Sequence, residues 1–268
     1  MSGSGILKGK HVVVFGAGGS IGAAVAKEFA AQGAEVFLSG RSQASVGEVA
    51  KAIASADGRA HAEVIDALDE STVNDYLGRV AQQAGQIDVV FNAIGPRAND
   101  YGNGRNAVEL TTAEFMLPLS TIVKSQFITA RAAARQMVKQ RSGVILFVTG
   151  SPARGHVEGA TAIGAAFGAI ETFMENLALE IGALGVRAVC LRTMANIDSR
   201  AIGETVDALA SRMNVPRDQV IGRLASLNFL KVPATVADTA RAAAFLASDG
   251  ARMMTGTVVN ATAGAAAD

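Results

Sequence analysis

A glycine-rich segment near the N-terminus has residue types and a spacing that suit phosphate binding. The octapeptide FGAGGSIG (15–22) follows an apolar run, HVVVFG (11–16), and opens a helical pattern, SIGAAVAKEFAAQG (20–33). Glycines let a pyrophosphate approach the backbone, and the first turn of a helix supplies N–H donors and positive potential. Because it lies between a strand and a helix, the segment predicts a dinucleotide site; a tight turn without a ligand is the alternative. The predicted cofactor contacts are Gly16, Gly18, Ser20, Ile21 and Gly22.

The ends of the next two strand patterns indicate which dinucleotide would bind. A carboxylate after the second strand, EVFLSG (35–40), would accept hydrogen bonds from the ribose of NAD, but Gly40 and Arg41 stand there. A guanidinium suits the 2′-phosphate of NADP, so Arg41 favours NADP over NAD. A solvated surface arginine is the alternative. Asp66 ends the third strand pattern, where it is either an acceptor for an adenine amino group or a turn residue.

Strand-like runs alternate with helical patterns along the chain, and these elements must position the residues above. They include IDVVFNAIG (87–95), GVILFVTGS (143–151), GVRAVCLR (185–192) and a long helix around 112–140. Strands that alternate with helices form a parallel, doubly wound sheet with helices on both faces. With 268 residues, 50% of them hydrophobic and 29 of them glycine, the chain predicts a single α/β domain over residues 1–268.

The composition argues against several classes of protein. The 24 basic and 24 acidic residues cancel, so no general field favours binding to nucleic acid or to an acidic membrane. No apolar run is long enough for a membrane span. The single cysteine, Cys190, rules out an internal disulfide and fits a buried strand position. His11 and His61 have no second set of metal ligands. We expect a cytoplasmic, metal-free protein that binds a small molecule.

Four motifs in collinear order carry a family resemblance. GAGGSIG near the N-terminus is followed by DVVFNAIG (88–95), ALEIGALGVRAVCL (178–191) and ADTARAAAFLASDGARMMTGTVVNATAG. With these motifs the chain resembles the short-chain dehydrogenase/reductase family over essentially its whole length. The resemblance implies a Rossmann-type sheet of about seven strands, a nicotinamide cofactor and a homodimer or homotetramer. It also implies that Asn92 braces the cofactor loops and that Gly95, in the same motif, contacts the cofactor.

The residues that carry the family's chemistry are replaced in this chain. The resemblance implies that a tyrosine donates a proton, that a lysine four residues later lowers the pKa of this tyrosine, and that a serine and an asparagine assist. The flanking sequence places Ile163 at the tyrosine, Phe167 at the lysine, Ile122 at the asparagine and Gly150 at the serine. No tyrosine follows Tyr101, so shifting the alignment does not restore the motif. Ser20 and Thr193-Met194 are further departures, at a usual glycine and a usual Pro-Gly.

Three other residues could supply the chemistry that is missing. Ser151 and His156 lie in the loop SPARGHVEG (151–159), which leads into the altered helix, and Tyr101 lies in the loop after Asn92. His156 titrates near neutrality, and Ser151 could bind an oxyanion. A surface histidine, a plain turn serine and a loop tyrosine outside the cleft are the alternatives. The segment 194–230 lies where the family has a mobile substrate lid, and its Ile, Leu and Met content indicates a fairly apolar ligand.

The sequence leaves three functions open. The first is an NADP-dependent oxidoreductase that acts on a small, fairly apolar carbonyl compound, alcohol or enone with a non-standard proton donor. The second is a catalytically inactive NADP-binding subunit with a regulatory or assembly role. The third, which has less support, is a lyase or dehalogenase on the same fold.

Overall fold

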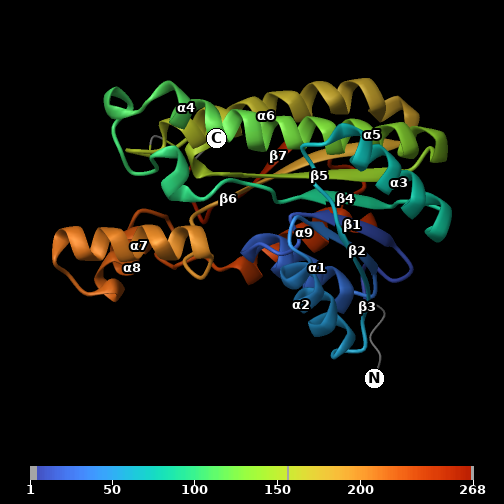
Figure 1. The fold of residues 1–268 in the computed structure, drawn as a ribbon, viewed down its shortest axis with the longest axis horizontal. Helices are drawn as coiled ribbons and strands as arrows, with labels where there is room; N and C mark the ends of the chain where they lie inside the picture. Colours follow the sequence, from blue (N-terminus) through green and yellow to red (C-terminus); the bar gives the residue numbers. More distant parts are fainter. Residues whose placement is uncertain (1–4, 156, 267–268) are drawn as a thin grey trace.

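Seven parallel strands form the central sheet of the computed structural model, which describes residues 5–155 and 157–266 (Figure 1). Their order in this described part is β3-β2-β1-β4-β5-β6-β7. The chain moves outward from β1 to β3, returns to lie beside β1, and moves outward again to β7, which confirms the predicted doubly wound fold. The strands are β1 His11–Phe15, β2 Glu35–Gly40, β3 Arg59–Val64, β4 Val89–Asn92, β5 Gly143–Gly150, β6 Val186–Thr193 and β7 Thr257–Ala261.

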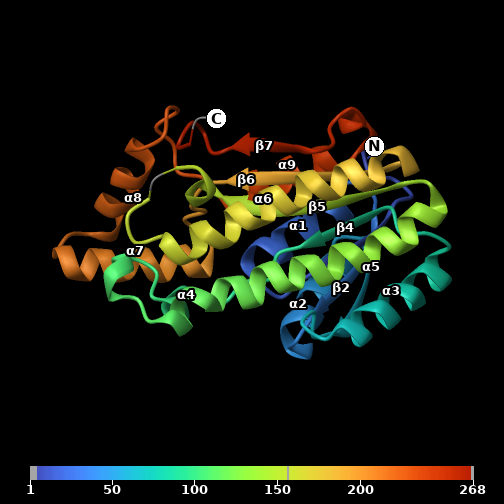
Figure 2. The ribbon, with the colours of Figure 1, turned by 90° about the horizontal axis from the view of Figure 1, so that it is seen from above.

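Helices cover both faces of the sheet (Figures 1 and 2). One layer contains α1 Ser20–Ala31, α2 Gln43–Ala54 and α9 Val236–Ala247, and the other contains α3 Glu70–Ala84, α5 Lys124–Gln140 and α6 Thr161–Ile181. An apolar cluster lies between the sheet and each layer. In α6 the buried residues recur every three or four positions, so one stripe of the helix packs on the sheet. This stripe consists of Ile163, Ala166, Ile170, Met174, Leu177 and Ile181.

The predicted long helix around 112–140 is interrupted. α4 Thr112–Pro118 ends at a proline, and the π-helical turn η3 Leu119–Val123 connects it to α5. Pro118 has no N–H to donate to the preceding turn, which weakens the regular helical pattern at this point. The π-helical turn contains Ile122, whose side chain is buried. Wide turns of this kind are frequent at functional sites.

The third strand begins and ends two residues earlier than its sequence pattern, HAEVID (61–66), predicts. β3 ends at Val64, and Asp66 lies in a turn in which its Oδ1 accepts a hydrogen bond from the N–H of Leu68 at 3.0 Å. A carboxylate that bonds to the backbone two residues later stabilises a turn rather than a strand. Asp66 thus stabilises a turn in this structure, and its contact with an adenine amino group stays a prediction.

Two helices project beyond the carboxyl end of β6, clear of the three layers (Figures 1 and 2). They are α7 Arg200–Met213 and α8 Arg217–Ser226, and they lie in the segment 194–230. Hydrogen bonds fix the base of this segment to the start of α9: Thr239 Oγ1 donates to Asn196 Oδ1 at 3.0 Å, and the N–H of Val236 donates to Asp198 Oδ1 at 2.8 Å.

Candidate active site

A cavity of about 780 Å³ opens at the carboxyl ends of the strands. The glycine-rich loop at 19–21, the turn after β4 at 93–98, the end of β5 with the start of α6, and α7 all line it. In open α/β sheets, ligands bind in this crevice, where the strand order reverses between β1 and β4. Ser20, Ile21 and Gly95 line the cavity, whereas the other predicted cofactor contacts are not among its lining residues.

The backbone of the glycine-rich loop excludes side chains at two of its glycines. Gly16 has a φ of +73°, a conformation that glycine adopts at little cost. A Cβ at Gly22 would lie 2.3 Å from the carbonyl oxygen of Gly16, so a side chain there would force the loop apart. α1 then begins at Ser20 without a side-chain cap. Its first N–H groups therefore remain available to an anion.

Ser20 connects the glycine-rich loop to α7. Its Oγ accepts a hydrogen bond at 3.0 Å from the N–H of Arg200, the first residue of α7. The Ser20 hydroxyl keeps its proton for donation to a ligand. The contact holds the N-terminus of α7 against the N-terminus of α1, and both helix ends line the cavity.

Asn92 fixes the turn that follows β4. Its Oδ1 accepts from the N–H of Ile94 at 2.9 Å, and its Nδ2 donates to Thr129 Oγ1 on α5 at 2.9 Å. Gln126 Nε2, also on α5, donates to the carbonyl oxygen of Asn92 at 2.9 Å. These bonds hold Gly95 at the cavity wall.

Arg41 and Asp66 lie outside the cavity, at the ends of neighbouring strands. Arg41 is exposed and forms no ion pair with the part of the chain that the structure describes. It directly follows Gly40, where an added Cβ would lie 3.9 Å from the backbone nitrogen of Gly18. Arg41 therefore follows a residue that lies next to the glycine-rich loop.

The four positions that the alignment equated with catalytic residues meet at the cavity. Ile122 and Ile163 are buried in its wall, and Phe167 and Gly150 lie beside them. A Cβ at Gly150 would lie 3.0 Å from Cε2 of Phe167. A serine side chain at 150 would therefore require this ring to shift by a few tenths of an ångström. The glycine and the phenylalanine fit each other, and neither offers a hydrogen-bond donor through its side chain.

Tyr101 brings a hydroxyl group to the cavity. It ends the short helix η1 Ala98–Tyr101 and lines the cavity, with its side chain 8% exposed. Its hydroxyl forms no hydrogen bond with any described residue. Burial raises the pKa of Tyr101 to about 12. This phenol therefore stays protonated at neutral pH and is available as a donor.

The other two predicted catalytic residues differ in what the structure describes of them. Ser151 begins the short helix η4 Ser151–Ala153 and lines the cavity. Its carbonyl oxygen accepts from the N–H of Gly155 at 2.7 Å, which closes a tight turn. His156 lies outside the described residues.

A family model described as Enoyl-(Acyl carrier protein) reductase matches residues 16–266. The chain belongs to the short-chain dehydrogenase/reductase family. This confirms the family predicted from the sequence. The chain is 29% identical over 267 residues to the 3-oxoacyl-(acyl-carrier-protein) reductase FabG of Chlamydia trachomatis, covering 98% of this chain and 100% of the relative. It is 26% identical over 259 residues to the 7alpha-hydroxysteroid dehydrogenase of Escherichia coli K12, covering 96% and 94%.

Solved structures of this family share the fold. Levodione reductase superimposes with a TM-score of 0.87 at 23% identity, over 96% of this chain and 97% of that one. A variant of actinorhodin polyketide ketoreductase solved with NADPH gives 0.85 at 18% identity, over 96% and 97%. At these low identities the superpositions show that this short-chain dehydrogenase/reductase shares their fold, and nothing further.

A buried ion pair next to the cavity escaped the sequence analysis of this short-chain dehydrogenase/reductase. Glu171 on α6 and Arg192 on β6 are 1% and 2% exposed, and the two guanidinium–carboxylate contacts are both 2.9 Å. Thr149 Oγ1 donates to Glu171 Oε1 at 2.9 Å. In the sequence, the feature that could have revealed this pair is Glu171, a carboxylate on the apolar stripe of α6 one turn after Phe167. The pair joins the ends of β5 and β6 to the helix that borders the cavity.

Several other expectations concern the chain as a whole. Cys190 is buried, and burial raises the pKa of its thiol to about 12, in agreement with a structural role. Among the described residues, no His, Cys, Asp or Glu side chains are grouped so as to hold a metal ion. Within the same part of the chain, every helix is too short or too polar to span a membrane.

Proposed function

We propose that this short-chain dehydrogenase/reductase is an NADP-dependent reductase that acts on a small, fairly apolar carbonyl compound or enone. The observation that carries the proposal is the unpaired hydroxyl of Tyr101 in a cavity that also contains the dinucleotide loop. The cavity thus combines a place for a hydride donor with a proton donor outside the positions that the family uses.

The residues present fit an NADP molecule at its diphosphate and adenosine ends. The uncapped N-terminus of α1 suits the diphosphate, and Arg41 suits the 2′-phosphate. Asp66 keeps Oδ2 free to accept from an adenine amino group while Oδ1 closes its turn. When bound, the nicotinamide supplies a hydride. Related structures have been solved with NADPH and with NAD+, and Arg41 is the feature that favours NADP here.

The cavity wall supports a fairly apolar substrate. Ile122, Ile163 and Phe167 form its inner surface, and Leu209 and Leu224 of the projecting helices face it from outside the sheet. We propose that the segment 194–230 acts as the substrate lid. Apolar walls exclude water, which strengthens the few polar contacts that orient the substrate.

Tyr101 is the proposed proton donor. Hydride addition leaves negative charge on the substrate oxygen, and the phenol donates a proton to that atom. With its pKa raised to about 12, Tyr101 is protonated at neutral pH, which is the form that donates a proton. Ser151, at the same cavity wall, is proposed to donate a second hydrogen bond to this oxygen. His156 is the alternative acid.

The first measurement is a calorimetric titration with NADPH and then NADH. We expect NADPH to bind more tightly, and Arg41→Asp to weaken NADPH binding far more than NADH binding. Equal losses for both dinucleotides would exclude Arg41 as the 2′-phosphate ligand.

The activity test is a screen of apolar ketones, aldehydes and enones with NADPH. For a substrate that is reduced, Tyr101→Phe is expected to lower kcat about 10²-fold to 10⁴-fold, the range for loss of a general acid. Tyr76→Phe, in a buried tyrosine outside the cavity, is the matched control and should leave kcat unchanged. Unchanged rates in Tyr101→Phe, Ser151→Ala and His156→Ala would refute all three proposed roles.

A catalytically inactive NADP-binding subunit is the second candidate. Its supporting observation is the mutual fit of Gly150 and Phe167, which leaves the usual catalytic corner of the cavity without a polar side chain. Tight NADPH binding without turnover of any substrate would favour it. A lyase or dehalogenase has less support, because the dinucleotide loop then needs a new role; firm NADPH binding would count against it.

We also propose a homodimer or homotetramer. Phe127 on α5 and Leu179 on α6 are 43% and 83% exposed on the outer helical layer, and apolar side chains of this size favour burial against another copy. Light scattering after gel filtration measures the oligomeric state, and a monomer would refute the proposal.

A further inference from the structure

Two arginines at the cavity have no role in the function proposed so far. Arg97 lies in the turn after β4, and Arg200 is the first residue of α7. Both side chains line the cavity together with Gly19, Ser20 and Ile21. Both residues are exposed, and neither forms an ion pair with a described residue. Two arginines therefore line the cavity that contains the N-terminal end of α1, and neither is paired with a carboxylate of the described residues.

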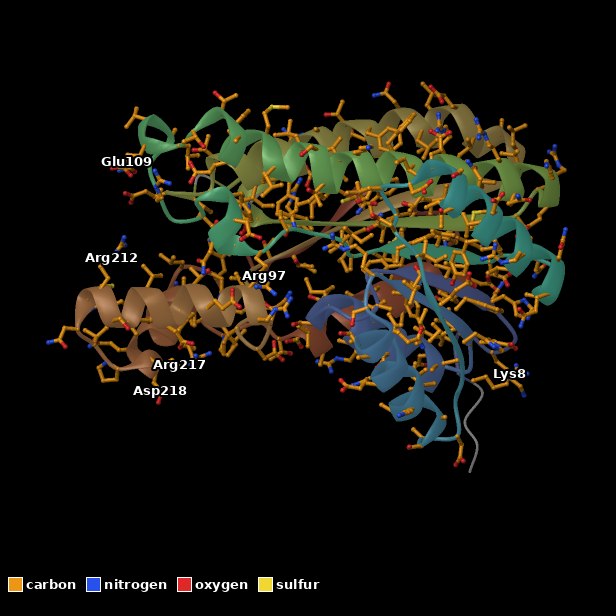
Figure 3. The ribbon with its side chains drawn as sticks, viewed as in Figure 1. Lys8, Arg97, Glu109, Arg212, Arg217 and Asp218 are labelled. Atoms are coloured by element: carbon orange, nitrogen blue, oxygen red, sulfur yellow. The ribbon has the colours of Figure 1, made fainter. Side chains whose placement is uncertain are left out.

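Backbone hydrogen bonds hold both arginines in place. The Arg200 N–H donates to Ser20 Oγ at 3.0 Å, so the long Arg200 side chain starts within a few atoms of the first turn of α1. The Arg97 carbonyl oxygen accepts from the N–H of Asp100 at 3.1 Å, which anchors η1. Figure 3 shows Arg97 next to the first turn of α7, and Arg212 at the far end of this helix.

The other charged side chains at the cavity are placed differently. Arg105 is already paired with Glu114. Arg212 lines the cavity but lies twelve residues after Arg200 on α7, about 18 Å along the helix axis. Three carboxylates also line the cavity and limit its positive charge. They are Glu109, Glu158 and Glu204. None of the three forms an ion pair with Arg97 or Arg200.

We infer that Arg97 and Arg200 form a clamp that binds the diphosphate of the dinucleotide together with the glycine-rich loop, an inference that rests on the proposed function. A diphosphate carries two negative charges, which match the two guanidinium groups and the N-terminal ends of α1 and α7. Phe167 presents no donor to a ribose hydroxyl at the far end of the cavity. Phosphate contacts then hold the nicotinamide half of the cofactor in place.

The test is calorimetric titration of the full chain with NADPH, NADH and ADP-ribose, which all contain the diphosphate. Arg97→Gln and Arg200→Gln are each expected to weaken all three by a similar factor, about 10-fold or more, because each loses a charge-assisted hydrogen bond. Arg212→Gln is the matched control in the same cavity and should change each dissociation constant less than twofold. Since all three arginines are exposed, the melting temperature should not change.

The outcomes separate the clamp from the proposed function. If NADPH binds but Arg97→Gln and Arg200→Gln have no larger effect than Arg212→Gln, the clamp is refuted, whether or not the protein is a reductase. A loss confined to NADPH also refutes it, because the contact would then concern the 2′-phosphate. If the expected losses occur without turnover of any substrate, the clamp stands and the reductase proposal fails. Failure of the unchanged protein to bind any of the three ligands overturns both.

Discussion

The buried pair of Glu171 and Arg192 allows a quantitative test of how the cavity is held in shape. Leucine at position 171 removes the carboxylate that accepts two hydrogen bonds from Arg192 and one from Thr149. Breaking a buried ion pair from one side costs about 3–5 kcal/mol, because the buried Arg192 guanidinium loses its contacts with the Glu171 carboxylate. Arg154 lies 3.6 Å from Glu171 but is 61% exposed, so it adds little. We therefore expect Glu171→Leu to lose about 3–5 kcal/mol of unfolding free energy.

The assay is urea denaturation followed by circular dichroism, with two comparison variants. Glu171→Leu/Arg192→Met replaces both charges by apolar groups and should recover most of the loss, as apolar replacements of buried pairs commonly do. Glu175→Leu changes an exposed carboxylate one turn further along α6 and should cost less than about 0.5 kcal/mol. A loss below about 1 kcal/mol in Glu171→Leu, or no recovery in the double variant, would refute this account of the pair.

Three further predictions concern the loop and the cavity. Gly22→Ala places a Cβ 2.3 Å from a backbone oxygen in the same loop, so NADPH affinity measured by calorimetry should fall more than tenfold. Gly78→Ala, at an open position of α3, should leave affinity unchanged, and equal affinities in both variants would contradict the steric argument. Because the raised pKa of Tyr101 favours its neutral form, alcohol oxidation should accelerate as pH rises toward about 12; a flat profile would exclude Tyr101 as the base. Gly150→Ser should lower the melting temperature when Phe167 is present and less in the Phe167→Ala background, because the ring occupies the space of the new side chain; equal shifts would disprove this fit.

Local sequence patterns were sufficient for most of the sheet. The runs 143–151 and 185–192 correspond to β5 Gly143–Gly150 and β6 Val186–Thr193, since a buried parallel strand reads as an apolar run that begins and ends near glycine or polar residues. The interruption between α4 and α5 was missed because residues on both sides of Pro118 continue the helical spacing.

The glycine-rich loop could be predicted because its constraints are local. Gly16 and Gly22 restrict a loop of eight residues, and such restrictions appear directly in the sequence. Glu171 and Arg192 are 21 residues apart and meet only after α6 packs on β6, so neither residue signals the other. The same holds for Arg97, whose position at the cavity depends on how the turn after β4 lies relative to α7.

The cavity itself gives a reason to favour an active protein over an inactive scaffold. Gly16 and Gly22 do not distinguish an active protein from an inactive scaffold, because the loop needs both glycines for its own packing. The hydroxyl of Tyr101 differs in its place at the cavity, since the buried Tyr76 hydroxyl also has no partner among the described residues but lies outside the cavity. A phenol in a largely apolar wall, without a hydrogen bond to any described residue, contributes nothing to folding that phenylalanine would not. The oxygen of a bound carbonyl substrate is a partner that this hydroxyl would serve in a reductase, which favours an active protein.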